Sequence, residues 1–395
     1  MKPFGHAWRG DWPLEPGLIY LNHGTVGVTP LRVLEAQRAI RNEIEANPSR
    51  FLLRELCEIV VGQPQQRRPR LRQAADVVGA FVGARGDDIV FVDNTTTGAN
   101  AILRSFPLAA GDEIVVSDFG YGGVTRAVMQ AARERGATVR TASMPYPVAS
   151  DAQIIDAFEA ALGPRTKLAV VDHVTSESAL VLPLAAIAGR FRARGVAVLA
   201  DGAHAPGAIP LNIPALGVDW YIGNLHKWLW VPRSSGILWA SPERQPSLRP
   251  AVVSWGLEQG FNAEFDMPGT RDPSPHLSAP AAIAFMQELG VDAVRQHNHG
   301  LAWDGARYLA GAWRTPFVTP EALVGTMATV MMPDSLGTSA EDAARVRDAL
   351  LFDNSIEVQV HAFRGRLYAR ICGQVYNEMS DVHRLAETVA ALAGY

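Results

Sequence analysis

The sequence predicts an α/β protein: a large domain built on a mostly parallel seven-stranded sheet, followed by a smaller C-terminal α+β domain. Short apolar segments alternate with amphipathic helical patterns from about residue 70 to about residue 240. This rhythm is typical of a parallel sheet covered by helices on both faces. From about Ser274, longer helical patterns flank fewer strands. The 395 residues are enough for one large core and a second, smaller one.

The elements follow from local patterns in chain order. A helix is expected over residues 31–47, because it starts after Pro30 and stops at Pro48. The seven expected strands are residues 88–92, 113–117, 138–142, 167–172, 196–201, 220–223 and 236–240, with helical patterns at 122–136, 151–162 and 184–194. Farther on, helices are expected at 280–297, 301–312, 340–352 and 380–392, and strands at 326–332, 357–361 and 366–371. We therefore expect an N-terminal arm (1–30) that joins the small domain, a large domain (31–270) and a small domain (271–395).

The composition predicts a cytoplasmic globular enzyme. Apolar residues make up 48% of the chain, and 36 Lys and Arg face 40 Asp and Glu, a net charge of -4. This balance favours neither nucleic acid nor an anionic membrane surface as a partner. Cys57 and Cys372 are the only cysteines, which fits a reducing compartment and leaves no cysteine-rich metal site. We expect no bound metal, no signal peptide and no membrane-spanning segment.

Lys227 is the most informative residue, because it stands between His226 and the apolar run Trp228-Leu229-Trp230. In such surroundings desolvation lowers the pKa of a lysine, so that a neutral amine can attack a carbonyl. Upstream, a predicted strand ends in Asp201. A lysine that forms a Schiff base and an acid that pairs with a pyridinium nitrogen are what a pyridoxal phosphate enzyme requires. We therefore expect pyridoxal 5'-phosphate as the cofactor and an amino acid as the substrate.

Other parts of such a site fall at the ends of predicted strands, where open α/β sheets bind ligands. Thr95 and Thr96 open a helix and form a candidate phosphate cradle, although ordinary helix capping explains them equally well. Tyr121 lies between glycines and could stack on the pyridine ring, or pack on the sheet instead. His173 is interpreted as a site-lining or core histidine. The remaining cofactor candidates are His204 for the phenolic oxygen, and Asn224 and His226 for the phosphate.

Taken together, these motifs resemble the class V aminotransferase family of fold type I pyridoxal phosphate enzymes, and within it the isopenicillin N epimerase-like branch. The resemblance covers nearly the whole chain. The segments that carry it are Tyr20-Leu21-Asn22-His23-Gly24-Thr25-Val26-Gly27, Asp201-Gly202-Ala203-His204, Gly223-Asn224-Leu225-His226-Lys227-Trp228, Gly269-Thr270-Arg271, and Arg370 with Tyr376-Asn377. The family's fold is thereby implied for this chain.

The resemblance also implies roles at matching positions. Lys227 would hold the cofactor and abstract the Cα proton, and Arg370 would grip the substrate α-carboxylate, a bidentate task that suits a guanidinium. Taken alone, Arg370 reads as an exposed charge at a strand end. Thr270 resembles a residue that reaches the phosphate from the other subunit, which implies a homodimer with shared active sites. The other substrate-binding candidates are Asn22, His23, Gly24 and His173.

The motifs define the first chemical step more closely than the product. Epimerisation is the first hypothesis; it needs a second acid, for which Tyr121, His23 and His173 are candidates. The alternatives are a C–S lyase of the cysteine-conjugate or sulfoxide type, and an aminotransferase. A cysteine desulfurase is disfavoured, because residues 353–369 contain no cysteine. A cofactor-binding sensor fused to a DNA-binding module is a poor alternative, since no basic or helix-turn-helix segment precedes residue 20.

Arg50, Arg54 and Arg271 lie near segments that the resemblance places around the site. They make a second substrate carboxylate conceivable, but surface or subunit-interface charges are the favoured interpretation.

Overall fold

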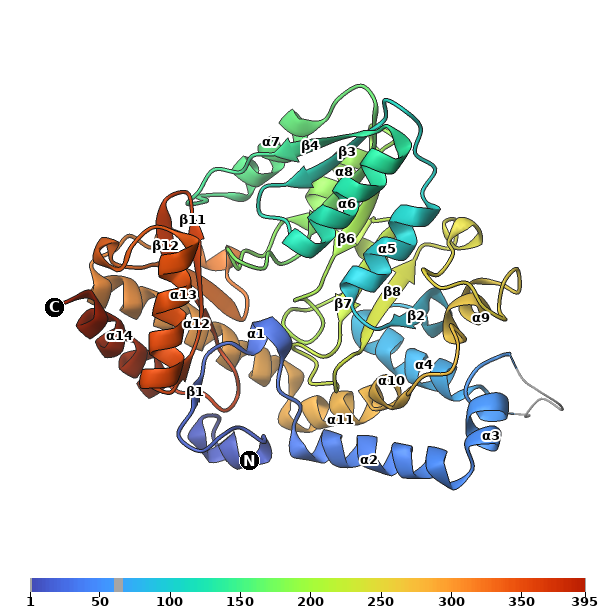
Figure 1. The fold of residues 1–395 in the computed structure, drawn as a ribbon, viewed down its shortest axis with the longest axis horizontal. Coiled ribbons are helices and arrows are strands. Elements are labelled where there is room, and N and C mark those ends of the chain that lie inside the picture. The colour runs from blue at the N-terminus through green and yellow to red at the C-terminus, as the bar shows by residue number, and fades with distance from the viewer. Residues whose placement is uncertain (1, 60–66, 395) are drawn as a thin grey trace.

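A computed structural model describes residues 2–59 and 67–394 (Figure 1). Its main feature is a seven-stranded sheet in the order β2-β8-β7-β6-β5-β3-β4. The strands are β2 (Ile89–Val92), β3 (Glu113–Ser117), β4 (Thr138–Ala142), β5 (Thr166–Asp172), β6 (Ala197–Asp201), β7 (Trp220–Asn224) and β8 (Gly236–Ala240). All neighbours are parallel except β8, which runs antiparallel to both β2 and β7. The prediction of a mostly parallel α/β sheet with seven strands is confirmed.

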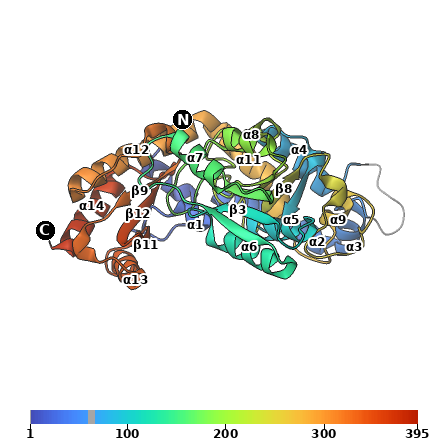
Figure 2. The same cartoon turned by 90° about the horizontal axis from the view of Figure 1, so that it is seen from above.

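Helices cover both faces of this sheet, as Figure 2 shows. Helices α5 (Thr95–Ser105) and α6 (Gly122–Arg135) lie on one face, and α4 (Arg70–Val82), α7 (Asp151–Ala161), α8 (Leu184–Arg192) and α11 (Ala279–Leu289) lie on the other. Because side chains alternate along a strand, Val90 and Val92 pack with the first group, whereas Ile89 and Phe91 pack with the second. This two-sided burial explains why the strands read as continuous apolar runs.

The C-terminal elements form a separate layer around a smaller sheet (Figure 1). Strands β9 (Met327–Met331), β11 (Gln359–Phe363) and β12 (Arg366–Cys372) pair antiparallel in the order β11-β12-β9. Helices α12 (Val291–Trp313), α13 (Ala340–Asp348) and α14 (Met379–Ala393) pack with them in one hydrophobic cluster. The N-terminal arm reaches this layer, since β1 (Ile19–Tyr20) pairs in parallel with β10 (Ile356–Glu357).

The remaining helices are short or lie at the periphery of the large sheet. They are α1 (His23–Val26), α2 (Leu31–Ala46), α3 (Pro48–Arg50), α9 (Phe261–Asp266) and α10 (Ser274–Leu277). Within residues 2–59 and 67–394, no helix is long and apolar enough to cross a membrane.

One predicted helix boundary is wrong. The sequence pattern placed a break between residues 297 and 301, but α12 runs without interruption through this segment and the break falls at Gly290. Gly290 has a φ of 82°, a left-handed conformation that ends α11 and that glycine adopts readily. Domain boundaries at residues 30 and 270 stay a prediction; α11, which follows the second boundary, still packs in the cluster of α4 and α8.

Candidate active site

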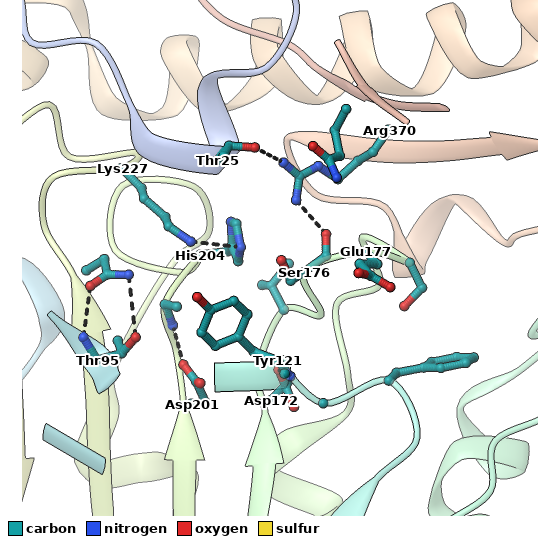
Figure 3. A pocket seen from close by; sticks show the side chains of 18 of the residues that line it. Thr25, Thr95, Tyr121, Asp172, Ser176, Glu177, Asp201, His204, Lys227 and Arg370 are labelled. Carbon is teal, nitrogen blue, oxygen red and sulfur yellow. Dashed lines mark hydrogen bonds between the residues drawn. The ribbon is translucent and has the colours of Figure 1, made fainter. Parts of the chain in front are cut away.

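A cavity of about 690 Å³ lies at the carboxyl ends of the parallel strands, between the large sheet and the C-terminal layer (Figure 3). Lys227 and His226 follow β7, Asp201 ends β6 and Asp172 ends β5. Arg370 reaches the same cavity from β12. Its volume is typical of small-molecule sites, which span about 300–1,000 Å³.

Lys227 is buried in this cavity, with 9% of its surface exposed. Burial lowers its pKa to about 8, because the ammonium loses its hydration, and the positive charge of Arg370 adds to this effect. The negative charge of Asp201 opposes the shift only in part. A substantial fraction of Lys227 is therefore a neutral amine near physiological pH.

A hydrogen-bond chain supports the same protonation state. The indole Nε1 of Trp228 lies 3.4 Å from Nδ1 of His204, and Nε2 of His204 lies 3.1 Å from Nζ of Lys227. An indole N–H is only a donor, so Nδ1 must accept and the proton of the neutral imidazole sits on Nε2. Since Nε2–H then points at Nζ, this arrangement favours the uncharged form of Lys227, whose amine accepts the hydrogen bond. Burial also lowers the pKa of His204 well below its usual range.

Asp201 presents an unsatisfied acceptor. Its Oδ1 accepts a hydrogen bond from the Ala203 backbone N–H, but Oδ2 is buried and has no partner among residues 2–59 and 67–394. Burial raises the Asp201 pKa to about 6, against the opposing effects of that N–H and of Lys227. A buried acceptor without a donor is costly. The protonated nitrogen of a pyridine ring would supply the donor, so the residues present fit pyridoxal phosphate.

Asp172 is a cavity-lining residue that the sequence motifs did not identify. It lies directly beside Asp201 in the register of β5 and β6, and it is buried. Loss of hydration, followed by the charge of Asp201, raises its pKa well above the usual range. Its Oδ1 accepts the backbone N–H of Tyr121 at 3.3 Å. Asp172 thus holds the turn that carries Tyr121. The sequence signal that could have identified Asp172 is the one that identified Asp201, an acidic residue at the end of a predicted strand.

Tyr121 precedes α6 and has 44% of its surface exposed. Figure 3 shows its ring reaching across the cavity above Asp201, from the side opposite to Lys227 in this view. No hydrogen bond of the Tyr121 hydroxyl is present within the described part of the chain. The position suits a ring that covers a flat cofactor.

The candidate phosphate residues gather at the start of α5. Asn224 Oδ1 accepts the backbone N–H of Thr95 at 3.0 Å, so these two residues hold each other, and Thr96 lines the cavity beside them. His226 Nδ1 faces the backbone of Ser235, 2.7 Å from its carbonyl oxygen and 3.3 Å from its nitrogen, which leaves Nε2 for a ligand. Burial lowers the His226 pKa to about 4. A phosphate at Nε2 would raise this pKa, because it stabilises the imidazolium.

Arg370 is 2% exposed, so its interpretation as an exposed charge is wrong. Its Nη1 donates to the carbonyl oxygen of Ser176 at 2.6 Å, and its Nη2 donates to Asn22 Oδ1 and Thr25 Oγ1 at 3.1 and 2.7 Å. No carboxylate forms an ion pair with it within residues 2–59 and 67–394. A buried guanidinium without a counter-ion favours an anionic ligand.

Three of the other predicted substrate-binding residues lie behind the cavity wall. Asn22 orients Arg370 and donates to Glu357. His23 is fully buried between the hydroxyl of Tyr376 and the carbonyl oxygen of Lys227. Gly24 packs where a Cβ would lie 2.5 Å from the sulfur of Met327. Their direct contact with substrate stays a prediction, because the structure places these residues in supporting positions behind the cavity lining.

His173 and Thr270 also lie outside this cavity. His173 Nδ1 is 2.9 Å from the hydroxyl of Tyr221, beneath the strand ends. Thr270 is exposed in the connection between α9 and α10, where it lines separate depressions with Arg271. Sequence reasoning missed Thr25 and Ser176, whose contacts with Arg370 join segments distant in sequence.

Comparison with known proteins decides the family. A sequence model of the Aminotransferase class-V family matches residues 19–332. The chain belongs to the class V aminotransferase family. It is a pyridoxal phosphate enzyme, and its homologues include epimerases and lyases.

Among its relatives is isopenicillin N epimerase of Streptomyces clavuligerus, which is 32% identical over 98% of both chains. Putative L-cysteine desulfhydrase 1 of Oryza sativa subsp. japonica is also 32% identical, over 96% of this chain and 84% of that protein. The class V fold is shared with the apo cysteine desulfurase of Thermococcus onnurineus NA1, with a TM-score of 0.81, 19% identity, and coverage of 100% of this chain and 99% of the other.

Proposed function

We propose that this class V enzyme epimerises an amino acid at Cα, with Lys227 removing the proton and Tyr121 returning one. The observation that carries the proposal is the placement of the three candidate acids. His23 and His173 are buried and hydrogen-bonded away from the cavity, whereas Tyr121 lines it with its hydroxyl unpaired within the described residues. Lys227 and Tyr121 enter the cavity from opposite sides in Figure 3, as inversion at Cα requires.

The other residues prepare this proton transfer. Bound pyridoxal phosphate supplies an electron sink that acidifies the Cα proton. Lys227 is a suitable base because its pKa, lowered to about 8, lies close to physiological pH. Arg370 binds the α-carboxylate and fixes which bond of Cα faces Lys227, and Asp201 keeps the pyridine nitrogen protonated. Thr95, Thr96, Asn224 and His226 hold the phosphate.

A C–S lyase is the second candidate, because relatives at similar identity are named L-cysteine desulfhydrases. β-Elimination needs Lys227 and a leaving group, but no acid on the opposite side. An aminotransferase ranks behind both. A persulfide-forming desulfurase remains disfavoured: Cys57 and Cys372 are buried, and β11 and β12 are joined by the short turn at Arg364 and Gly365, which offers no cysteine.

We also propose a cytoplasmic homodimer with shared active sites. The exposed Thr270, which the family resemblance places near the partner's phosphate, supports the dimer. Exposed Val252, Val253 and Trp255 lie on the preceding loop and provide apolar surface for the same contact. Sedimentation of the purified enzyme at micromolar concentration should give twice the monomer mass of 42.6 kDa.

A panel of amino acids in D2O tests the reaction. Deuterium at Cα with loss of enantiomeric purity, read by NMR and chiral chromatography, is expected for an epimerase. The Tyr121→Phe variant should still exchange the Cα proton of one enantiomer with solvent, but it should convert that enantiomer into the other far more slowly. Keto acid with ammonia, or a released sulfur product, would assign a lyase instead, and accumulation of pyridoxamine phosphate would assign an aminotransferase.

A further inference from the structure

We infer that the part of the cavity beyond Arg370 selects amino acids whose side chain ends in a cation, through Glu177, and rejects those that end in a carboxylate. The inference rests on the proposed function, since it names the substrate class of the same site.

The far wall of the cavity is aromatic. Phe119, Tyr146 and Phe363 pack edge to face with ring centroids 5.5–5.6 Å apart. Phe119 and Tyr146 come from loops of the large sheet and Phe363 from β11, so the wall closes the gap between the two layers. Rings that touch one another leave no cage for a cation between them. They form instead a flat apolar surface along which an alkyl chain can lie.

The charges of this region leave one negative group unneutralised. Asp118 is paired with Arg364 at 3.0 Å. Arg370 is committed to the substrate α-carboxylate under the proposed function. Glu177 is exposed and lines the cavity, and its carboxylate has no ion pair or hydrogen bond within residues 2–59 and 67–394. With a substrate carboxylate bound at Arg370, Glu177 is therefore the uncompensated charge in the part of the cavity beyond Arg370.

The backbone at Glu177 is held in place, which distinguishes it from an ordinary surface carboxylate. The carbonyl oxygen of Glu177 accepts the hydroxyl of Thr329 at 2.6 Å, and that of Ser176 accepts Arg370 Nη1 at 2.6 Å. Figure 3 shows Glu177 beside Ser176, whose carbonyl oxygen is hydrogen-bonded to Arg370. The backbone that carries the Glu177 carboxylate is thus tied to the element that holds Arg370, next to the proposed α-carboxylate site.

The neighbouring polar group adds no charge. His361 is 8% exposed, stacks on Tyr368 and has a buried Nδ1 without a partner in the described chain. Burial lowers its pKa to about 4, helped by the charges of Arg370 and Arg347, so it is neutral at physiological pH. Neither His361 nor the adjacent Gln359 offsets the charge of Glu177.

Three amino acids of equal chain length test the inference on the holoenzyme: L-lysine, L-norleucine and L-2-aminoadipate. Binding is measured from the change of cofactor absorbance, and turnover from deuterium at Cα. We expect lysine to bind most tightly and 2-aminoadipate least, each step being about fivefold, as for a partly exposed ion pair. Glu177→Gln should level the three affinities, and Glu177→Lys should reverse their order.

Glu387→Lys is the matched control, because Glu387 is exposed on α14 and does not line the cavity. It changes the net charge equally and should leave the order unchanged. The inference is overturned if wild type prefers 2-aminoadipate, or if Glu177→Lys keeps the wild-type order. Exchange at Cα without charge preference would refute this inference alone. Absence of exchange with every amino acid of the wider panel would refute the proposed function and this inference together.

Discussion

Replacement of Trp228 by Phe should raise the pKa of Lys227, although the indole donates its hydrogen bond to His204 and not to the amine. The indole N–H holds His204 Nδ1 as an acceptor and so directs Nε2–H at Lys227. Without that donor, the ring can place its proton on Nδ1 and turn a lone pair toward Nζ. This arrangement favours the ammonium.

The size of the effect follows from one hydrogen bond. A neutral hydrogen bond contributes about 1 kcal/mol to stability, and 1.36 kcal/mol corresponds to one pKa unit. The Lys227 pKa, about 8 in the wild-type protein, should therefore rise by about 0.7 units. At neutral pH the neutral fraction of the amine would fall by a factor of about five.

The assay is carried out on the apoenzyme. The pH dependence of acylation at Lys227, read by peptide mass spectrometry, gives the lysine pKa, and ¹⁵N NMR of the His204 ring reports its tautomer. Trp230→Phe is the matched control, because Trp230 is also fully buried and its Nε1 has no partner in the described chain. Equal Lys227 pKa values in the two variants, or a wild-type His204 protonated on Nδ1, would refute the reasoning.

Three further predictions concern buried charges. Folding lowers the pKa of Lys227 from 10.5 to about 8, so between these pH values the unfolded chain binds more protons than the folded one. The free energy of unfolding of the wild-type apoenzyme, relative to that of Lys227→Met, should therefore rise by up to about 3 kcal/mol as the pH increases through this window. Urea unfolding would show this rise. Asp201→Asn should slow Cα deuterium exchange by about 100-fold, because a neutral amide cannot stabilise the pyridinium charge; unchanged exchange contradicts this role. Arg72→Met should destabilise the fold by about 3–5 kcal/mol, since it strands Asp266, its fully buried partner at 2.7 Å; a urea midpoint close to wild type would contradict it.

Much of the fold could be predicted because its signals are local. Each strand of the large sheet is a short apolar run between turn residues, and each was expected at nearly its observed position. The break at Gly290 could not be predicted, because a glycine inside a helical pattern can adopt either a helical or a positive φ. Gly300 stands in a similar setting and is helical. Tertiary packing separates the two cases, because α11 packs with the large sheet whereas most of α12 joins the C-terminal cluster.

The sequence by itself determined the family, the cofactor and the pairing of Lys227 with Asp201, because these depend on residue types at strand ends and on motif spacing. The tertiary structure decided which polar groups meet. Arg370 is buried against Asn22 and Thr25, which lie 348 and 345 positions away, and His204 contacts both Trp228 and Lys227. Asp118 is paired with Arg364, whereas Glu177, which also lines the cavity, has no ion pair within the described residues. Such contacts arise when distant segments converge, and spacing along the chain does not encode them.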